Sequence, residues 1–559
     1  SAMLRGLLLG DKSGIRQVWT DAYRRTGTYH ALVISGSHVT LVCAIFLLWR
    51  RRWGFGERTL LALAGATAWI YALMAGGDPP VMRAAAALTL YVFACLLYRR
   101  TSLLNVLAGV AIVFLAIDPG QLFDASFQLS FLAVAALGAF TPEADEWRVP
   151  PARAMALRLE LRLLAETFWL ASGLSEGVWR RVRGTAGPPL GRLWALFRLS
   201  AGVQAGLALP MVLLFHRVSF TGLGANLIVV PIVSCAIPFG FAAVFSGSHT
   251  VARATAWLLD AAAGAAAWHV RYEPALRVPD PPVWLCLLIP AAFLAWAVSH
   301  RLATKAVWAT VCAALLALMV AWPFEPRTAH GALELTAIDV GQGESLALTL
   351  PDGSLAMVDG GGLPQYGRRT ASTFDVGEEV VSPYLWSRGV RRVAVLAVTH
   401  LHDDHAGGAA ALLDNFRPHE LWSGFAPDHP VWRRLEARAR ALGIAVRVLK
   451  QGDEFDCGGA RWQVLSPARE QPWTGKPRND DSLVLRVRYG RHAFLLTGDI
   501  ERRVEARLLE EGLARPAQVL KVAHHGSRLS SLPPLLDLLH PAVAVISAGA
   551  GNSYHLPNE

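Results

Sequence analysis

The first 324 residues contain about ten long apolar runs, and this feature constrains the fold more than any other in the sequence. A helix needs roughly 20 predominantly apolar residues, with a lower limit near 17, to cross the hydrocarbon core of a bilayer. A large soluble core does not explain so many such runs in succession, so we predict a polytopic α-helical membrane domain over residues 29–324. The runs at Pro210 and Pro231 could be broken or re-entrant helices instead of simple spans. The candidate spans are 29–49, 59–76, 81–98, 102–117, 124–140, 200–216, 223–246, 251–270, 282–299 and 305–323.

Arginine-rich loops lie between these runs on one side only, and such loops stay in the cytoplasm when a membrane protein inserts. The basic loops are Arg50–Arg58, Arg99–Arg100, 141–199 and 300–305. The alternate loops carry acids or no charge. If the number of spans is even, residues 1–28 form an extracytoplasmic lead-in and the C-terminal half is extracytoplasmic as well.

Residues 141–199 are too polar to span, yet their apolar residues recur at helical spacing. We predict a cytoplasmic amphipathic connection that lies along the membrane surface with its arginines toward the headgroups. A docking site for a cytoplasmic motor is the alternative.

The formal net charge of +10 does not indicate a nucleic-acid-binding patch, because the excess lies between the apolar runs. Residues 331–559 carry nearly equal numbers of basic and acidic side chains. Of the six cysteines, only Cys457 lies outside the apolar segments, and no CxxC pair occurs. This pattern excludes a disulfide framework and a thiolate metal site. The abrupt ends of the sequence indicate that the natural chain extends further.

Several polar side chains lie within the apolar runs, where they are costly and therefore functional candidates. One interpretation is that they bond neighbouring helices, at roughly 0.6 kcal/mol for each hydrogen bond. The other is that they line a polar conduit, because they are separated and accompanied by Gly and Pro breaks. The candidate conduit residues are His30, Ser35, Ser37, His38, Gln128, Gln204 and Asn226.

The pattern changes after residue 324 to that of a layered α/β domain, which we place at 330–559. "SLALTL" and "SLAMV" alternate with period two and are joined by the turn "PDGS". Later strands such as "RVAVLAVTH" and "HAFLLTGDI" end in His, Asp or Gly, and amphipathic helices separate them. Open sheets place their sites at such strand ends.

Residues 399–408, "THLHDDHAGG", hold a dense cluster of metal-binding side chains directly after one of these strands. His400 and His402 leave the strand at i and i+2, so both can point to one side. Asp404 and His405 follow on the turn and can reach a second position. Imidazole and carboxylate groups suit zinc or manganese. Asp499, also at a strand end, can bridge two such ions.

Two further imidazoles, His524 and His525 of "VAHHGS", follow another apolar strand. A divalent metal centre of one or two ions would make hydroxide available near neutral pH and hold a substrate oxygen. Asp404 could orient the attacking water or accept its proton. Phosphodiester, acyl ester and lactam substrates all fit this set of residues.

"HLHDDH" with "TGD" resembles the metallo-β-lactamase fold, an αββα sandwich. "AIDVGQGESLAL", "MVDGGG", "NDDSLVLRV" and "LKVAHHGS" together resemble one branch of it, the C-terminal domain of ComEC-type DNA-uptake channels of natural competence. "LLLGDKSG", "TGTYHALVISGSHVTL", "DASFQLSFLA" and "GLGANLIVVP" are similar to the competence domain of that family. The resemblance covers nearly the whole chain.

The resemblance implies an inner-membrane channel that imports single-stranded DNA in transformation, with an extracytoplasmic nuclease domain that degrades the other strand. It implies DNA and membrane lipids as partners, together with a cytoplasmic motor and an extracytoplasmic DNA receptor. The motifs carry Asp359, Asp404 and Asp499 over as catalytic residues. The metal site that they imply is His400, His402, Asp404, His405, Asp499 and one of the "HHGS" histidines, with His525 preferred over His524. Asp339, Gln342, Asn479, Asp480 and Ser482 fall on family motifs that shape the site or touch phosphate, and Lys521 and Ser527 are further phosphate candidates.

The chain departs from the wider superfamily because "NDDS" occupies the region of a separate third-motif histidine. This departure predicts that one of the two metal ions binds less tightly. The ending "NSYHLPNE" differs from the usual N-x-Y-G-H-P, which leaves His555 as a candidate ligand only. Two alternative functions follow: a DNA channel whose lactamase-like domain only binds and guides DNA, and a membrane-tethered metallo-hydrolase of lipids or small esters.

Overall fold

The computed structural model describes residues 2–10, 17–32, 36–48, 56–97, 102–140, 197–274, 276–363 and 374–558. The predicted amphipathic connection at 141–199 lies outside these residues except for its last three positions. The chain divides into two compact units, which we describe separately. One comprises Ser1–Leu276 and Pro282–Ala321, and the other comprises Arg277–Pro281 and Trp322–Glu559.

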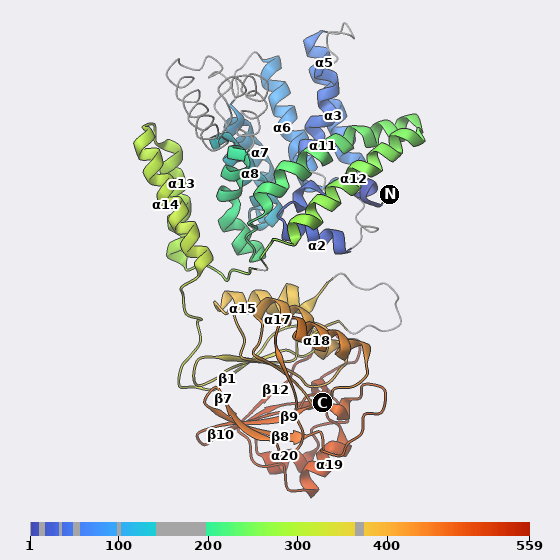
Figure 1. Ribbon diagram of the computed structural model, residues 1–559, viewed down its shortest axis with the longest axis vertical. Coiled ribbons are helices and arrows are strands. Elements are labelled where there is room, and N and C mark those ends of the chain that lie inside the picture. Colours follow the sequence, from blue (N-terminus) through green and yellow to red (C-terminus); the bar gives the residue numbers. More distant parts are fainter. Residues whose placement is uncertain are drawn as a thin grey trace, which may run out of the picture. The chain divides into compact units, whose positions relative to one another are not determined.

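The regular elements described in the first unit are helices (Figure 1). Short helices α1 and α2 at the start of the chain bury Met3, Leu7 and Tyr23 against apolar side chains of α11 and α12. A second apolar cluster joins α3, α5 and α6. The main helices are α1 (Ala2–Leu9), α2 (Gln17–Arg25), α3 (Gly36–Leu48), α5 (Glu57–Met74), α6 (Pro79–Leu96), α7 (Leu103–Ile117), α8 (Ala125–Phe140), α11 (Gly222–Ser246), α12 (His249–Val270), α13 (Val283–Val298) and α14 (Leu302–Ala321), with a further helix over Phe197–Phe215.

The predicted number of spans is not confirmed. Within the described residues, four helices are long and apolar enough to cross a bilayer: Pro79–Leu96, Phe197–Phe215, Gly222–Ser246 and Leu302–Ala321. Four other apolar helices are shorter, with 10–17 residues. An apolar run does not fix the length of a helix, because a turn can interrupt it.

The predicted spans at 29–49 and 251–270 are not among these four helices, for two different reasons. The first divides into a 3-10 turn at Tyr29–Ala31 and α3, which has 13 residues. The second corresponds to α12, in which Arg253 and Asp260 lower the hydropathy.

The two proline-containing runs are continuous helices. Pro231 and Pro238 lie inside α11, which has 25 residues, and Pro210 lies inside the helix over Phe197–Phe215. A proline removes one backbone hydrogen bond and kinks a helix, while the neighbouring bonds carry it on. Broken helices at these two prolines are therefore not observed.

The second unit is a sandwich of two six-stranded mixed sheets. The first has the order β1-β2-β3-β4-β5-β6 and the second β12-β11-β10-β9-β8-β7. In the first sheet the strands from β3 to β6 are parallel; in the second, β10, β11 and β12 are parallel. The strands are β1 (Glu334–Ala337), β2 (Leu346–Thr349), β3 (Leu355–Val358), β4 (Val395–Val398), β5 (Glu420–Ser423), β6 (Ala445–Val448), β7 (Glu454–Cys457), β8 (Ala460–Ser466), β9 (Val484–Tyr489), β10 (His492–Leu496), β11 (Val519–Lys521) and β12 (Val543–Val545).

Helices cover the outer face of each sheet (Figure 1). An apolar cluster beneath α15 (Ser382–Ser387), α17 (Ala409–Phe416) and α18 (Pro430–Ala441) packs on the first sheet. A second lies beneath α19 (Arg502–Glu510) and α20 (Pro533–Leu539). The sheets meet through a third, which contains the fully buried Trp422 and Trp462. This αββα order confirms the predicted fold class of the C-terminal half.

Candidate metal centre

The predicted site residues come from loops at the ends of buried strands. Asp359 follows β3, and residues 399–405 follow β4, which is parallel to β3, so both loops leave the same edge of the sheet. The backbone N–H of Asp359 donates to Ala397 O in β4 at 2.8 Å and holds the first loop against that strand. Asp499 follows β10, and the histidine pair follows the parallel strand β11. Both sheets thus deliver polar side chains to one place.

His400 and His402 lie side by side, as their i, i+2 spacing predicts. His400 Nε2 is 3.0 Å from His402 Nδ1, and His400 Nδ1 is 3.3 Å from Ser482 Oγ. Burial lowers the pKa of His400 well below the usual histidine range, and the neighbouring His405 adds to the effect. A neutral imidazole, which is the form that binds metal ions, is therefore favoured at His400.

His405 is fixed by Asp359, which the sequence suggested as a catalytic residue. His405 Nδ1 lies 2.7 Å from Asp359 Oδ2, and Asp359 also accepts from the N–H and Oγ1–H of Thr399 at 2.7 and 2.6 Å. All three residues are buried. This arrangement places the Nδ1 proton between His405 and Asp359 and turns Nε2 toward Asp499, 3.2 Å away. Asp359 thus acts through His405 and lies behind the cluster.

Asp404, Asp499 and His525 complete the cluster. His525 Nε2 is 3.5 Å from Asp404 Oδ2 and 3.4 Å from Asp499 Oδ2. His525 Nδ1 lies 2.7 Å from Ser547 O, to which its N–H donates, so Nε2 is the nitrogen that faces the two carboxylates. Asp404 is the most open of these three residues, with 21% of its side chain exposed, whereas the side chains of Asp499 and His525 are 3% and 2% exposed.

The charges of these groups are strongly coupled. Burial opposes protonation of His525, but Asp404 and Asp499 outweigh it and raise the pKa of His525 to about 9. Burial would raise the pKa of Asp404, yet His525 and His405 lower it to about 2. The pKa of Asp499 is likewise held well below its usual range, against burial, by His405 and His525. The site therefore attracts positive charge.

The donor set fits a divalent metal ion. His405 Nε2, His525 Nε2 and Asp499 Oδ1 are buried without a hydrogen-bond partner among the described residues. Buried polar atoms are normally paired, and converging imidazole nitrogens and carboxylate oxygens are ligands of zinc and similar ions. Three overlapping groups have ligand atoms within 4.8 Å of one another: His400, His405 and Asp499; Asp404, His405 and His525; and Glu344, Asp499 and His525.

The two adjacent histidines of "HHGS" differ in direction. Both have left-handed backbone conformations, with φ of 50° at His524 and 55° at His525. His525 enters the cluster, whereas His524 Nδ1 lies 3.4 Å from Glu501 Oε1. His555 is exposed and belongs to none of the three ligand groups.

The residues predicted to shape the site or touch phosphate mainly stabilise loops. Asp339 accepts from Gly341 N, and Gln342 Oε1 accepts from Gly549 N, each at 3.1 Å. The other loop contacts are Asn479 Nδ2 to Glu501 Oε1 at 2.8 Å, Glu501 N to Asp480 Oδ1 at 2.9 Å, Asp499 N to Ser482 Oγ at 3.1 Å and Leu529 N to Ser527 Oγ at 3.3 Å. Lys521 is fully buried and its Nζ lies 2.6 Å from Glu344 Oε2, so its ammonium faces this carboxylate instead of solvent.

Sequence reasoning missed Glu344 and Thr399 as members of the site. Thr399 directly precedes "HLHDDH", and Glu344 directly follows "DVGQG". Their closeness to the recognised motifs was the available signal, but neither residue type is diagnostic by itself.

The conduit candidates in the first unit have individual surroundings. Gln128 Nε2 donates to Leu122 O at 2.9 Å, and Gln204 Nε2 donates to Ser219 O at 2.7 Å, as expected of residues that bond neighbouring segments. His38 is buried, and His30 is exposed with Nδ1 3.2 Å from Gly27 O. Asn226 Oδ1 is buried without a hydrogen-bond partner among the described residues. Ser35 and the side chain of Ser37 lie outside the described part of the chain.

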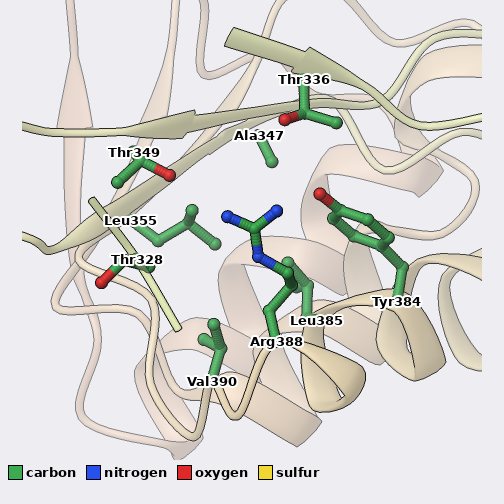
Figure 2. A pocket seen from close by; sticks show the side chains of 9 residues that line it. All are labelled: Thr328, Thr336, Ala347, Thr349, Leu355, Tyr384, Leu385, Arg388 and Val390. Carbon is green, nitrogen blue, oxygen red and sulfur yellow. The ribbon is translucent and has the colours of Figure 1, made fainter. Parts of the chain in front are cut away.

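A small hollow elsewhere in the second unit shares no lining residue with the cluster (Figure 2). The guanidinium of Arg388 extends into it beside Thr336 and Tyr384. Arg388 is engaged on both sides, since Nη2 is 3.4 Å from Glu334 Oε1 and Nε donates to Arg327 O at 3.1 Å. The hollow is therefore a packing feature between the first sheet and α15, separate from the metal centre.

Comparisons with known proteins agree with this architecture. The family model described as "Competence protein" matches residues 7–303, and that of the metallo-beta-lactamase superfamily matches residues 338–550. The chain is 28% identical over 579 residues to ComE operon protein 3 of Bacillus subtilis (strain 168), covering 100% of this chain and 68% of the relative. It is 27% identical over 573 residues to Competence protein ComA of Neisseria gonorrhoeae, covering 100% of this chain and 70% of the relative.

Solved structures give a weaker likeness. CmlA, a diiron beta-hydroxylase from Streptomyces venezuelae, is 17% identical with a TM-score of 0.26, covering 46% of this chain and 53% of that one. A putative metal-dependent hydrolase from Parabacteroides distasonis is 15% identical with a TM-score of 0.25, covering 42% of this chain and 90% of that one. Scores this low carry no argument about function.

Proposed function

The chain belongs to the competence protein family and carries a metallo-β-lactamase superfamily domain, and we propose that it is an inner-membrane channel importing single-stranded DNA, with a metal-dependent nuclease domain that degrades the other strand. The observation that carries the proposal is the buried His/Asp cluster of the second unit, in a chain whose first unit matches the competence family. In this proposal residues 29–324 form the channel and residues 330–559 the extracytoplasmic nuclease.

The side chains of the cluster would have different roles in hydrolysis, and most of them would be metal ligands. His400, His402, His405, Asp404, Asp499 and His525 would hold one or two divalent ions, Mn²⁺ or Zn²⁺. A bound ion supplies Lewis acidity that lowers the pKa of water and stabilises charge on the attacked phosphoryl group.

Asp404 is the residue suited to act on water. It is the most exposed carboxylate of the cluster, and its lowered pKa keeps it ionised and able to orient a water proton. Asp359 positions His405 through the 2.7 Å contact to Nδ1, which leaves Nε2 as the ligand atom. The buried Asp499 faces both His405 and His525 and would be a carboxylate ligand of the bound metal.

Two other functions fit parts of this description. The domain could bind and guide DNA without cutting it, which the absence of a separate third-motif histidine favours. A membrane-tethered hydrolase of lipids or small esters would use the same cluster, but anchoring alone needs a single span, whereas the described residues contain four helices of spanning length.

Cleavage by the full chain in detergent tests the proposal. Labelled single- and double-stranded DNA, a phospholipid and a small ester are offered with Mn²⁺, Zn²⁺ or Mg²⁺ to wild type, His402→Ala and Asp414→Asn. Asp414 is a matched control because its exposed carboxylate pairs with Arg438 outside the cluster. We expect metal-dependent nucleotide release by wild type and Asp414→Asn, at least about 100-fold less with His402→Ala, and no lipid hydrolysis. Lipid or ester hydrolysis in place of DNA cleavage would select the tethered hydrolase.

A partner-dependent arrangement follows from the same proposal. The imported strand would pass the polar residues of the first unit, a cytoplasmic motor would pull it, and an extracytoplasmic receptor would deliver the duplex. Membrane lipids surround the first unit. Each partner is tested by co-purification with the full chain in the presence of DNA.

A further inference from the structure

Glu344 is a buried carboxylate at the edge of the metal centre that belongs to none of the recognised ligand motifs. It lies in the loop between β1 and β2, and its side chain is 1% exposed. Three ligand atoms, one each from Glu344, Asp499 and His525, lie within 4.8 Å of one another. Neither Glu344 oxygen has a hydrogen-bond partner among the described residues. Leaving a carboxylate so buried costs free energy unless a cation compensates it.

Lys521 supplies one compensating charge but does not saturate Glu344. Its Nζ is 2.6 Å from Oε2, close enough for an ion pair although the angles are not those of a hydrogen bond, and it donates instead to Val522 O at 2.9 Å. The ion pair with Lys521 is thus made by Oε2, and Oε1 of Glu344 has no hydrogen-bond partner among the described residues. An ionised carboxylate offers about four lone-pair positions, so Glu344 can face Lys521 with one oxygen and a metal ion with the other.

The backbone fixes Glu344 relative to the recognised ligands. Its N–H donates to Asp404 O at 3.0 Å, and its carbonyl accepts from Gly361 N at 2.8 Å. The preceding residue, Gly343, allows this approach, because a Cβ there would lie 2.7 Å from Asp404 O. Glu344 is thus held against the turn that carries Asp404 with the rigidity expected of a metal ligand.

The local charges also leave room for a cation. Asp359, Asp404, Asp499 and Glu344 contribute four carboxylates and Lys521 one ammonium group, so that negative charge is in excess when the histidines are neutral. A divalent ion offsets most of this excess. Among the described residues, the group of His400, His405 and Asp499 has one carboxylate, whereas that of Glu344, Asp499 and His525 has two.

We propose that Glu344 is a further ligand of the metal position formed by Asp404, His405, Asp499 and His525, and that Lys521 is a positioning residue that holds its carboxylate. The proposal rests on the metal-binding part of the proposed function and is independent of DNA cleavage. It makes this position the tighter of the two, because it has more carboxylate ligands.

The test is a Mn²⁺ titration of the metal-free full chain in detergent, with bound metal measured by calorimetry and by elemental analysis after dialysis. Glu344→Gln removes the ligand charge at nearly constant volume. The double variant Glu344→Gln/Lys521→Met removes both charges of the pair, which is far less destabilising than stranding one of them. Glu505→Gln is the matched control, since Glu505 is also buried but accepts from Leu532 N outside the cluster.

We expect the Kd of the tighter step to rise at least about 10-fold in both Glu344 variants and to stay within twofold of wild type in Glu505→Gln. An unchanged Kd in the double variant would overturn the proposal and make the pair a purely structural ion pair. If neither variant folds, the structure of the wild-type chain with Mn²⁺ decides. A Glu344 oxygen within about 2.5 Å of the ion is expected, and one beyond 3.5 Å overturns the assignment.

These measurements separate the two proposals. A rise in Kd without nuclease activity in any variant supports the ligand and refutes the nuclease. DNA cleavage with unchanged metal affinity in the double variant supports the nuclease and refutes the ligand.

Discussion

Asp359→Asn is the sharpest perturbation of the metal centre, because it changes one atom and leaves the shape of the side chain intact. Asp359 has a left-handed backbone with φ of 61°, which Asn also tolerates. Its carboxylate accepts three short hydrogen bonds, two from Thr399 and one from His405 Nδ1. An amide has only one oxygen, so at least one of these buried donors must face an NH₂ group.

Either orientation of the new amide has a measurable cost. If the oxygen faces His405, the N–H of Thr399 loses a charge-assisted bond worth about 1.5–3 kcal/mol, and two buried donors oppose each other for about 1–3 kcal/mol more. The unfolding free energy of the metal-free domain then falls by about 3–5 kcal/mol, or roughly 6–20 °C in Tm for a domain of this size. If the NH₂ faces His405, the imidazole proton moves to Nε2, and metal affinity falls about 10- to 100-fold.

The assay combines thermal unfolding of the metal-free full chain with a Mn²⁺ titration. Asp414→Asn makes the same chemical change at a carboxylate that is 44% exposed, and should cost less than about 0.5 kcal/mol. A Tm within 2 °C and a Kd within twofold of wild type for Asp359→Asn would refute the role assigned to Asp359.

Three further outcomes follow from the geometry. In the metal-free protein the pKa of His525 is raised to about 9, above the usual value. The protonated His525 therefore adds to the unfolding free energy, in full below about pH 6.5, and this contribution is lost as the pH rises to 9. Because a metal ion must displace this proton, the affinity for the metal ion should rise about tenfold per pH unit between pH 7 and 9. Calorimetry in buffers of different ionisation enthalpy measures the proton release, and a pH-independent Kd would contradict this prediction. Gly343→Ala puts a Cβ 2.7 Å from Asp404 O. It should lower the unfolding free energy by about 1–3 kcal/mol and weaken metal binding. Wild-type values in both measurements would show that the loop accommodates the added methyl group. The buried carboxylate of Glu273 accepts from Phe220 N at 2.9 Å and from Thr221 N at 2.8 Å. Glu273→Gln weakens these bonds and should lower the unfolding free energy by about 1.5–3 kcal/mol. The measurement is the Tm in detergent, and an unaltered melting curve would refute this prediction.

The strand ends of the second unit could be predicted because the chemistry is local. "HLHDDH" follows a buried strand, and its spacing alone places His400 beside His402. The strands and amphipathic helices that the sequence displays predict a layered α/β domain, and the resemblance to the metallo-β-lactamase fold implies its αββα order. Such features depend on neighbours within a few residues, which a sequence shows directly.

Other features could not be predicted because they depend on distant contacts. Nothing in "GQGES" reveals that Glu344 meets Lys521, which comes from the other sheet. The choice between His524 and His525 depends on a turn in which both residues have positive φ. The lengths of the membrane-domain helices depend on turns such as that at Tyr29–Ala31, which apolar composition conceals.

The most direct test of the central proposal is strand-resolved cleavage of a duplex by the full chain. Each strand carries a different label, and nucleotide release is followed with Mn²⁺ for wild type and for Asp499→Ala, which lacks the buried carboxylate between His405 and His525. We predict metal-dependent nucleotide release from one strand by wild type and none by the variant. If both strands remain intact with every divalent metal while the protein still binds DNA, the domain is a guide and the nuclease assignment is wrong.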